Sequence, residues 1–227
     1  LLSENYYLER ALGPFTEVRR GQAVDLLKRD LAVLVYPDAG PDSPAEEQVI
    51  QKWVEGGGLL LRFAGPRLAE QSDQLLPVRL RRGGRTLGGA LSWERPAKLA
   101  PFAADSPFAG LAIPPDVTVA RQVLAEPDLD LASKTWARLV DGTPLVTAEK
   151  RGEGWVVLVH TTANAEWSNL ALSGLFVEML RRVVAMSQGV TGVGEGALPP
   201  LETLDGFGRL QHAPPTARPI SAKEVGS

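Results

Sequence analysis

The stretch Pro144–Leu180, PLVTAEKRGEGWVVLVHTTANAEWSNLALSGLFVEML, places an apolar strand, a polar loop and an amphipathic helix in succession. Trp155–Val159 (WVVLV) is too short and too continuously apolar for an amphipathic helix, and turn residues precede it, so it is predicted to be a buried strand. The polar loop His160–Ser168 follows, with Ser168 as the N-cap of the next helix. This helix is expected to bury four apolar residues at helical spacing: Leu172, Phe176, Met179 and Val183.

The first 75 residues alternate between helical and strand patterns, which is typical of a parallel sheet covered by helices. Two apolar runs, Leu31–Tyr36 (LAVLVY) and Leu59–Phe63 (LLLRF), are predicted to be interior parallel strands. Between them, Ser43–Glu46 combines an N-cap, a proline at the first helical position and the glutamate of a capping box. We therefore predict a helix that begins there and ends at Gly56–Gly58.

The segment before these strands has a weaker pattern. Ser3 is predicted to cap a short helix that Gly13 and Pro14 end. An extended piece over Phe15–Val18 and a helix over Gln22–Arg29 are expected next. The sequence begins at Leu1 in mid-pattern and without Met, so we expect it to be a piece of a longer protein.

Residues 76–150 carry short alternating segments separated by Gly and Pro, which predicts an antiparallel β insertion that ends in a meander. Residues 191–227 are rich in Gly and Pro and are interpreted as a linker or a surface strap. The predicted fold is an α/β three-layer sandwich over residues 1–190. Its sheet is mixed and largely parallel, of the flavodoxin-like kind, with the antiparallel insertion attached.

Composition excludes several classes of function. The chain has 227 residues, a net charge of −3 and no cysteine, so disulfides, thiolate metal sites and a cysteine nucleophile are excluded. No basic excess exists to neutralise phosphates, and nucleic acid is therefore not an expected partner. The two histidines, His160 and His212, lie in different regions, so neither a metal nor another cofactor is expected. No apolar run approaches the ~20 residues that a membrane-spanning helix needs.

Several motifs occur in an order that resembles the class I glutamine amidotransferase-like fold. The resemblance is closest to a branch that lacks the catalytic residues and occurs as an extracytoplasmic module of bacterial inner-membrane proteins of the aerotolerance-operon type. It implies a location on the periplasmic side of the inner membrane, with membrane association through segments outside this sequence. It also implies that the first strand of the fold is mostly missing here. The motifs are Asp141–Val146 (DGTPLV), Gly152–Val157 (GEGWVV), Thr161–Ala163 (TTA), Trp167–Leu170 (WSNL) and Phe176.

The resemblance also locates the position at which an amidotransferase carries its nucleophile. That elbow falls at Arg62–Gly65, where neither Phe63 nor Ala64 can attack a carbonyl. His160, with Glu166 six residues later, stands where a triad histidine is expected. A base without a nucleophile performs no acyl transfer, so we favour a structural hydrogen bond from His160 to the loop backbone.

A polar cleft is predicted at the carboxyl ends of the parallel strands, where the loops diverge. Two loops, Pro37–Gly40 and Ala64–Pro66, follow the predicted parallel strands. The third, beginning at His160, leaves a strand that we expect to be antiparallel, so its place there rests on the resemblance. The alternative interpretation is that the polar groups only satisfy loop backbone. The candidate residues are Asp38, Gly40, Gly65, His160, Thr161, Asn164 and Glu166.

Other candidate sites have ordinary structural explanations. Asp38 and Asp42 could join Glu166 in a carboxylate metal site, but acidic residues near a helix start are common capping groups. The basic run Arg79–Arg85 fits a solvated hairpin, and anionic lipid headgroups are its alternative partner. Three tryptophans could form a sugar-binding face, although core packing is the favoured explanation: Trp93, Trp136 and Trp155.

These observations favour a non-catalytic binding or assembly module of a membrane-anchored bacterial protein, with either a protein or a small polar molecule as its partner. The first alternative is a hydrolase that activates water in a cleft formed by His160, Glu166 and Asp38. The second is a domain that senses a small molecule or a glycan in the same cleft. Fold and function are separate inferences, because one scaffold can carry unrelated activities.

Overall fold

The computed structural model divides the chain into two compact units, Leu1–Gln188 and Gly189–Ser227. The described residues of the first unit are 3–71, 73–81 and 90–187, with the side chains of 90–95 excepted. In the second unit only the four strands listed below are described.

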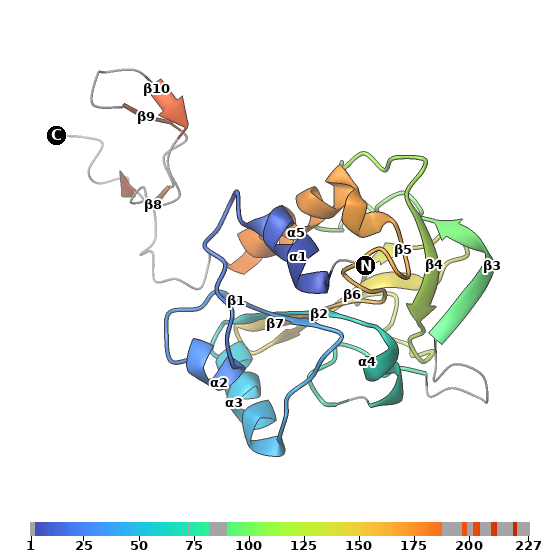
Figure 1. Cartoon of the computed structure of the whole chain (residues 1–227), viewed down its shortest axis with the longest axis horizontal. Helices are drawn as coiled ribbons and strands as arrows, with labels where there is room; N and C mark the ends of the chain where they lie inside the picture. Colours follow the sequence, from blue (N-terminus) through green and yellow to red (C-terminus); the bar gives the residue numbers. More distant parts are fainter. Residues whose placement is uncertain are drawn as a thin grey trace. The chain divides into compact units, whose positions relative to one another are not determined.

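The first unit is built on a five-stranded sheet in the order β1-β2-β7-β6-β5 (Figure 1). Strands β1, β2 and β7 are mutually parallel, whereas β6 pairs antiparallel with both β7 and β5. The mixed α/β fold predicted from the sequence is confirmed. The strand bounds are β1 Val33–Pro37, β2 Leu59–Phe63, β5 Thr135–Arg138, β6 Pro144–Arg151 and β7 Gly154–Val159.

Helices cover both faces of this sheet. On one face, α1 (Glu4–Leu12) and α5 (Gly174–Ser187) share a hydrophobic core with β2 and β7. On the other face, α2 (Ala23–Leu26) and α3 (Pro44–Glu55) form a second apolar cluster with alternate residues of the same strands. The two clusters account for the four apolar residues of β2, whose five residues, Arg62 included, are all buried.

Strand β7 corrects one expectation. We predicted that this strand would be antiparallel, and it is antiparallel to β6, but it runs parallel to β2 with Leu59 opposite Trp155 and Phe63 opposite Val159. The tight turn between β6 and β7 reverses the chain, so β6 takes the antiparallel direction. The loop after β7 therefore begins at the same edge of the sheet as the loops after β1 and β2.

Strand β1 corrects a second expectation, because it is the edge strand of the sheet and not an interior one. Only Leu34 of its five residues is fully buried. The extended piece predicted over Phe15–Val18 forms no strand, and the helix predicted over Gln22–Arg29 is limited to α2. Ser3 precedes α1 as predicted but makes no side-chain cap.

The predicted cap of α3 is present in modified form. Ser43 Oγ accepts the Glu46 N–H at 3.2 Å, as an N-cap should. The Glu46 carboxylate reaches the Asp42 N–H at 2.7 Å, one residue before the position that a capping box specifies. Its other oxygen accepts the Tyr36 hydroxyl at 3.0 Å, which ties the helix start to β1. The helix ends at Glu55, before the glycines, as predicted.

Helix α5 begins later than predicted. A 3-10 turn, η1 (Leu170–Leu172), precedes it, and Ser173 Oγ accepts the Phe176 N–H at 3.2 Å. The predicted cap at Ser168 is therefore wrong, and Leu172 is exposed because it belongs to the turn. The other three predicted core positions of this helix are buried: Phe176, Met179 and Val183.

The predicted antiparallel insertion contains the pair β3 (Ala90–Lys98) and β4 (Thr118–Val123), preceded by the short helix α4 (Pro66–Glu70). Trp136 and Trp155 pack against each other with ring centroids 5.4 Å apart, and both are partly buried against the core. The Trp93 side chain and most of the basic run Arg79–Arg85 lie outside the described residues.

The second unit was expected to be a linker or a strap, and the structure describes two short antiparallel pairs in it. One pair joins β9 to β10 and the other joins β8 to β11. The bounds are β8 Ala197–Leu198, β9 Glu202–Leu204, β10 Leu210–His212 and β11 Ile220–Ser221. Among all described residues, no helix has the length and apolar character that crossing a membrane requires.

Candidate functional site

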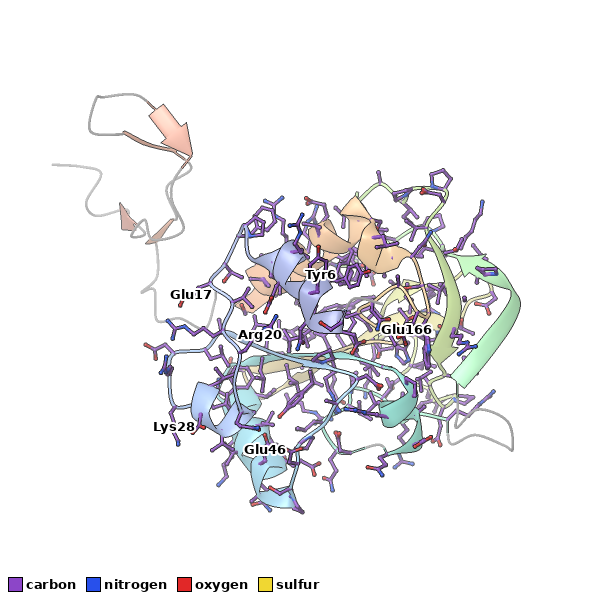
Figure 2. The ribbon with its side chains drawn as sticks, viewed as in Figure 1. Tyr6, Glu17, Arg20, Lys28, Glu46 and Glu166 are labelled. Atoms are coloured by element: carbon purple, nitrogen blue, oxygen red, sulfur yellow. The ribbon has the colours of Figure 1, made fainter. Side chains whose placement is uncertain are left out.

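A cavity of about 280 Å³ lies at the carboxyl edge of the three parallel strands. It is lined by residues from the start of α1, the end of β1, the start of α4 and the loop after β7. Glu166 lies at this end of the sheet in Figure 2. The lining residues are Glu4, Pro37, Asp38, Pro66, Arg67, Thr162, Asn164 and Glu166.

Asp38 is held by the backbone of α4. Its carboxylate accepts the N–H groups of Gly65 at 2.9 Å, Leu68 at 3.1 Å and Arg67 at 3.2 Å. The residue has a φ of 37°, a left-handed conformation that Asp tolerates better than most residues. A Cβ at Gly65 would lie 2.5 Å from the Asp38 carboxyl carbon, so only glycine permits this approach. The helix start is thus satisfied by an internal carboxylate.

Gly40 serves a different cluster, around the buried guanidinium of Arg62. Arg62 donates to Asp73 at 2.5 Å and to the carbonyls of Ala39 at 2.7 Å and Leu75 at 3.0 Å. A Cβ at Gly40 would lie 2.7 Å from the Asp73 carboxylate. Gly40 therefore makes room for the ion pair and does not line the cavity.

His160 is fully buried and both of its ring nitrogens are engaged. Nδ1 lies 2.7 Å from the Val123 carbonyl and Nε2 lies 2.9 Å from Thr147 Oγ1. Burial lowers the pKa of His160 to about 4, against a smaller opposing effect of the Val123 hydrogen bond. At neutral pH, Nδ1–H must therefore donate to the carbonyl, which leaves Nε2 to accept the Thr147 hydroxyl.

The loop after His160 alternates between structural and cavity-lining side chains. Thr161 donates to the Arg121 carbonyl at 3.0 Å and is buried. Asn164 lines the cavity and accepts the Glu166 N–H at 3.0 Å. Thr162 also lines the cavity, and its Oγ1 is buried without a hydrogen-bond partner among the described residues.

Glu4 completes the acidic wall of the cavity. One oxygen accepts the Ala163 N–H at 3.0 Å, which joins the start of α1 to the loop after β7. Burial raises the pKa of Glu4, and the neighbouring charges of Asp38 and Glu166 raise it further. The Ala163 hydrogen bond and the positive charge of Arg67 act in the opposite direction.

The structure brings three of the seven candidate residues together in the cavity: Asp38, Asn164 and Glu166. Gly65 lies against Asp38, whereas His160, Thr161 and Gly40 belong to buried networks beside the cavity. The sequence analysis missed Glu4, Arg67 and Thr162 as lining residues. Glu4 could not be found from sequence, because only the packing of α1 brings it to this edge. Thr162 could have been found, since it lies in the loop that follows β7.

The elbow after β2 contains no nucleophile. Phe63 and Ala64 are fully buried, and Phe63 packs against Phe176 with ring centroids 6.0 Å apart. In the part of the chain that the structure describes, no group of three or more His, Asp or Glu residues could hold a metal ion. The site therefore consists of carboxylates, one guanidinium, an amide and a threonine whose hydroxyl has no partner in the described part of the chain, around a small cavity.

No protein-family model matches the chain, and no curated protein matches it either. Among solved structures, Cytoplasmic Protein STM1381 from Salmonella typhimurium LT2 is similar at a TM-score of 0.59 and 14% identity. The alignment covers 86% of this chain and 89% of that one. Cytoplasmic Protein STM3548 from Salmonella typhimurium is similar at 0.56 and 15% identity, over 74% and 76% of the two chains. At these identities, the likeness shows a shared fold and no more.

Proposed function

We propose that this chain is a non-catalytic binding module that holds a small polar ligand in the cavity at the carboxyl edge of its parallel strands. Thr162 carries the proposal, because the residue lines the cavity while its hydroxyl is buried and has no partner among the described residues. A buried hydroxyl without a hydrogen bond costs free energy. A rotation of the Thr162 side chain would turn the hydroxyl toward the cavity, where a ligand atom would supply the missing bond.

The charges around the cavity favour a ligand that carries a protonated amine. Three carboxylates, those of Glu4, Asp38 and Glu166, face a single guanidinium, that of Arg67. Asp38 is occupied by backbone donors, so Glu4 and Glu166 are the groups that can bind a cation. A positive ligand would also offset burial and, to a lesser extent, the repulsion from Asp38 and Glu166, which together raise the pKa of Glu4.

The same geometry counts against an enzyme. His160 has no free nitrogen, since one donates to Val123 and the other accepts from Thr147. It therefore cannot act as a base on water in the cavity, which the alternative of a hydrolase requires. The covalent route lacks a nucleophile at Phe63 and Ala64. Of the three residues that the hydrolase alternative requires, Asp38 is occupied by backbone donors and only Glu166 is left to contact a ligand.

Binding can be tested by titrating the 15N-labelled protein with ethanolamine, and with glycerol as an uncharged comparison. We expect ethanolamine to shift the amide signals of Gly65, Arg67 and Leu68, which hydrogen-bond Asp38, and glycerol to shift them less. Thr162→Val should abolish the shifts without lowering stability, because the hydroxyl has no partner to lose among the described residues and its burial costs free energy. The matched control Thr161→Val should reduce stability and keep the shifts.

Two results would contradict this proposal. One is the absence of saturable shifts at these amides with either probe. The other is ammonia release from glutamine by the purified protein that His160→Ala removes, which would show that the site is catalytic.

The cellular setting is also part of the proposal. The sequence resemblance supports a module on the periplasmic side of a bacterial inner membrane, anchored by segments outside this sequence. The two Salmonella proteins of similar fold are described as cytoplasmic, and their low identity carries no location to this chain. Protease accessibility in spheroplasts of the source organism decides the point. Resistance of the protein before lysis would exclude the periplasmic location.

A further inference from the structure

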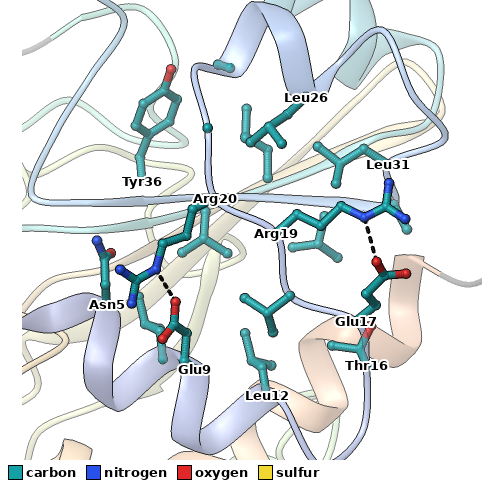
Figure 3. Close-up of a pocket in the computed structure, with 18 of the residues that line it drawn as sticks. Asn5, Glu9, Leu12, Thr16, Glu17, Arg19, Arg20, Leu26, Leu31 and Tyr36 are labelled. Atoms are coloured by element: carbon teal, nitrogen blue, oxygen red, sulfur yellow. Dashed lines mark hydrogen bonds and ion pairs between the residues drawn. The ribbon is translucent and has the colours of Figure 1, made fainter.

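Two hollows of the first unit differ in how their charged side chains are paired. The larger one is a groove of about 610 Å³ beside β1, and acidic and basic side chains pair with each other along it. Figure 3 shows Glu9 paired with Arg20 and Glu17 paired with Arg19. In the smaller cavity at the carboxyl edge, no charged lining side chain has an oppositely charged partner within 4.0 Å among the described residues. Charges of both signs are thus available to a ligand there.

Arg67 supplies the positive charge of this cavity. It lies in α4, its side chain is exposed, and its guanidinium donates to none of the described residues. Its charge is close enough to Glu4 to oppose the effect of burial, which raises the pKa of that carboxyl. A guanidinium presents a rigid fork of donors that fits an oxyanion. Arg67 can therefore bind an anionic group of a ligand in the cavity.

Asn164 provides a second set of donors. Only 8% of this residue is exposed, and it lines the cavity. Its Oδ1 accepts the Glu166 N–H, and because Nδ2 cannot accept a hydrogen bond, this contact fixes the orientation of the amide. Nδ2 donates to none of the described residues, so its hydrogens are available to a ligand.

The acceptors of the cavity are the carboxylates of Glu4 and Glu166. Glu4 uses one oxygen for a backbone N–H, and Glu166 accepts no hydrogen bond from a described residue. The third carboxylate of the cavity is already occupied by backbone donors. More than 4.0 Å separates the nitrogens of Arg67 from the carboxylate oxygens of Glu4 and Glu166. A ligand that binds both kinds of group must therefore carry two opposite charges and span this gap.

We propose that the ligand is a primary amine joined by a short chain to a phosphate, and that Arg67 selects for the phosphate. This ligand class depends on the binding function proposed above and makes it specific. The ammonium binds Glu4 and Glu166, whereas the phosphate accepts from Arg67 and Asn164. These donors come from α4 and from the loop after β7. The oxygens of a phosphate point in different directions and can accept from both elements, whereas a carboxylate accepts mainly in its own plane.

The test compares phosphoethanolamine with three probes. Ethanolamine lacks the phosphate, inorganic phosphate lacks the amine, and β-alanine carries a carboxylate in place of the phosphate. Each is titrated into the 15N-labelled full chain, and the amide signals of Gly65 and Leu68 are followed. We expect phosphoethanolamine to bind about fivefold more tightly than ethanolamine, because it adds an exposed ion pair with Arg67. β-Alanine and inorganic phosphate should both bind more weakly than phosphoethanolamine.

Arg67→Gln should remove this preference. It should weaken phosphoethanolamine binding about fivefold and tighten ethanolamine binding, because the guanidinium repels a simple ammonium. Asn164→Asp keeps the acceptor for the Glu166 N–H and replaces the donor with a charged oxygen, so it should act in the same direction. The control Arg138→Gln removes an exposed guanidinium from β5, at the opposite edge of the sheet from β1, and should change neither affinity.

The aminoethyl phosphate group is found both in the free monoester and in a lipid headgroup. Glycerophosphoethanolamine, a soluble diester, distinguishes these two sources. Tighter binding than that of phosphoethanolamine supports a lipid headgroup as the ligand, and weaker binding supports the free monoester.

Three results would overturn the proposed ligand class and leave the binding of an amine intact. The first is equal affinity for ethanolamine and phosphoethanolamine. The second is a phosphoethanolamine affinity that Arg67→Gln leaves unchanged. The third is tighter binding of β-alanine than of phosphoethanolamine. By contrast, inorganic phosphate that binds as tightly as phosphoethanolamine, or the absence of saturable shifts with every probe, would overturn the proposed function itself.

Discussion

Arg62, in β2, and His160, directly after the neighbouring strand β7, are both fully buried, yet the protein accommodates them in different ways. Arg62 keeps its charge and receives the carboxylate of Asp73 together with two carbonyl groups. His160 has no acidic partner and is neutral, because burial lowers its pKa to about 4. A guanidinium cannot lose its proton in a protein, whereas an imidazole can. The comparison shows that a buried base is accommodated either by a counter-charge or by deprotonation.

The cavity carboxylates form a third case. Asp38 is satisfied by three backbone N–H groups, whereas Glu4 is only partly satisfied by Ala163 and has a raised pKa. Glu4 is thus neither enclosed in a buried hydrogen-bond network nor fully exposed to solvent. A carboxylate whose hydrogen bonds are all made within the protein, such as that of Asp38, maintains the fold. A carboxylate that is only partly hydrogen-bonded, such as that of Glu4, can bind a ligand.

Removing the counter-charge of Arg62 should have the largest effect on the free energy of unfolding. Asp73→Ala leaves a buried guanidinium without its carboxylate, which is expected to reduce the free energy of unfolding by about 3–5 kcal/mol. Urea denaturation at pH 7 measures the change. The control Asp116→Ala removes an exposed carboxylate and should have little effect. A loss below about 1 kcal/mol for Asp73→Ala would show that Arg62 does not depend on the ion pair.

Lowering the pH should have the next largest effect on stability, and it should act through His160. The pKa of His160 is about 4 in the folded protein, below the ordinary value of 6.5, so the unfolded chain binds a proton first as the pH falls. Stability is therefore complete above about pH 6.5 and falls by roughly 3 kcal/mol between pH 6.5 and pH 4. His160→Gln, which cannot titrate, should show a smaller fall over this range. Identical pH profiles for the two proteins would refute the assignment.

Asp38→Ala should have a moderate effect. The substitution removes the acceptor of the Gly65, Arg67 and Leu68 N–H groups, which begin α4. Loss of a helix cap costs about 1–2 kcal/mol. Asp38→Asn is the matched control, since it keeps one oxygen acceptor and tolerates the left-handed backbone. Equal losses in Asp38→Ala and Asp38→Asn would mean that the charge, and not the hydrogen bonding, is what matters.

Glu4→Gln should have the smallest effect, and its pH dependence should have the opposite sign to that of His160. The pKa of Glu4 is raised in the folded protein, so its carboxylate opposes folding as the pH rises above the ordinary value. Gln keeps the acceptor for the Ala163 N–H and removes the charge. We expect the Tm of Glu4→Gln to exceed that of the parent at pH 7 and to approach it at pH 4. Glu153→Gln, at an exposed turn, serves as the control. A lower Tm at pH 7 would contradict this sign.

Much of the fold was predictable because the signals are local. The apolar run of β2 and the Ser43–Glu46 cap of α3 depend on residues close together in sequence, and both elements formed where predicted. The start of α5 was misplaced because two serines, Ser168 and Ser173, precede the same apolar pattern. Local sequence does not show which of them caps the helix.

The sequence by itself determined the fold class, the absence of a nucleophile at the elbow and the polar character of the loop after β7. Only the tertiary structure decided which polar groups face the cavity. His160 and Thr162 are two residues apart and both polar, yet His160 is enclosed by Val123 and Thr147, whereas Thr162 lines the cavity and its hydroxyl bonds to none of the described residues. The partners of His160 lie 37 and 13 residues away in the chain, so no local pattern contains this information. The edge position of β1 is equally non-local, because an apolar strand has the same sequence whether one or both of its sides are paired.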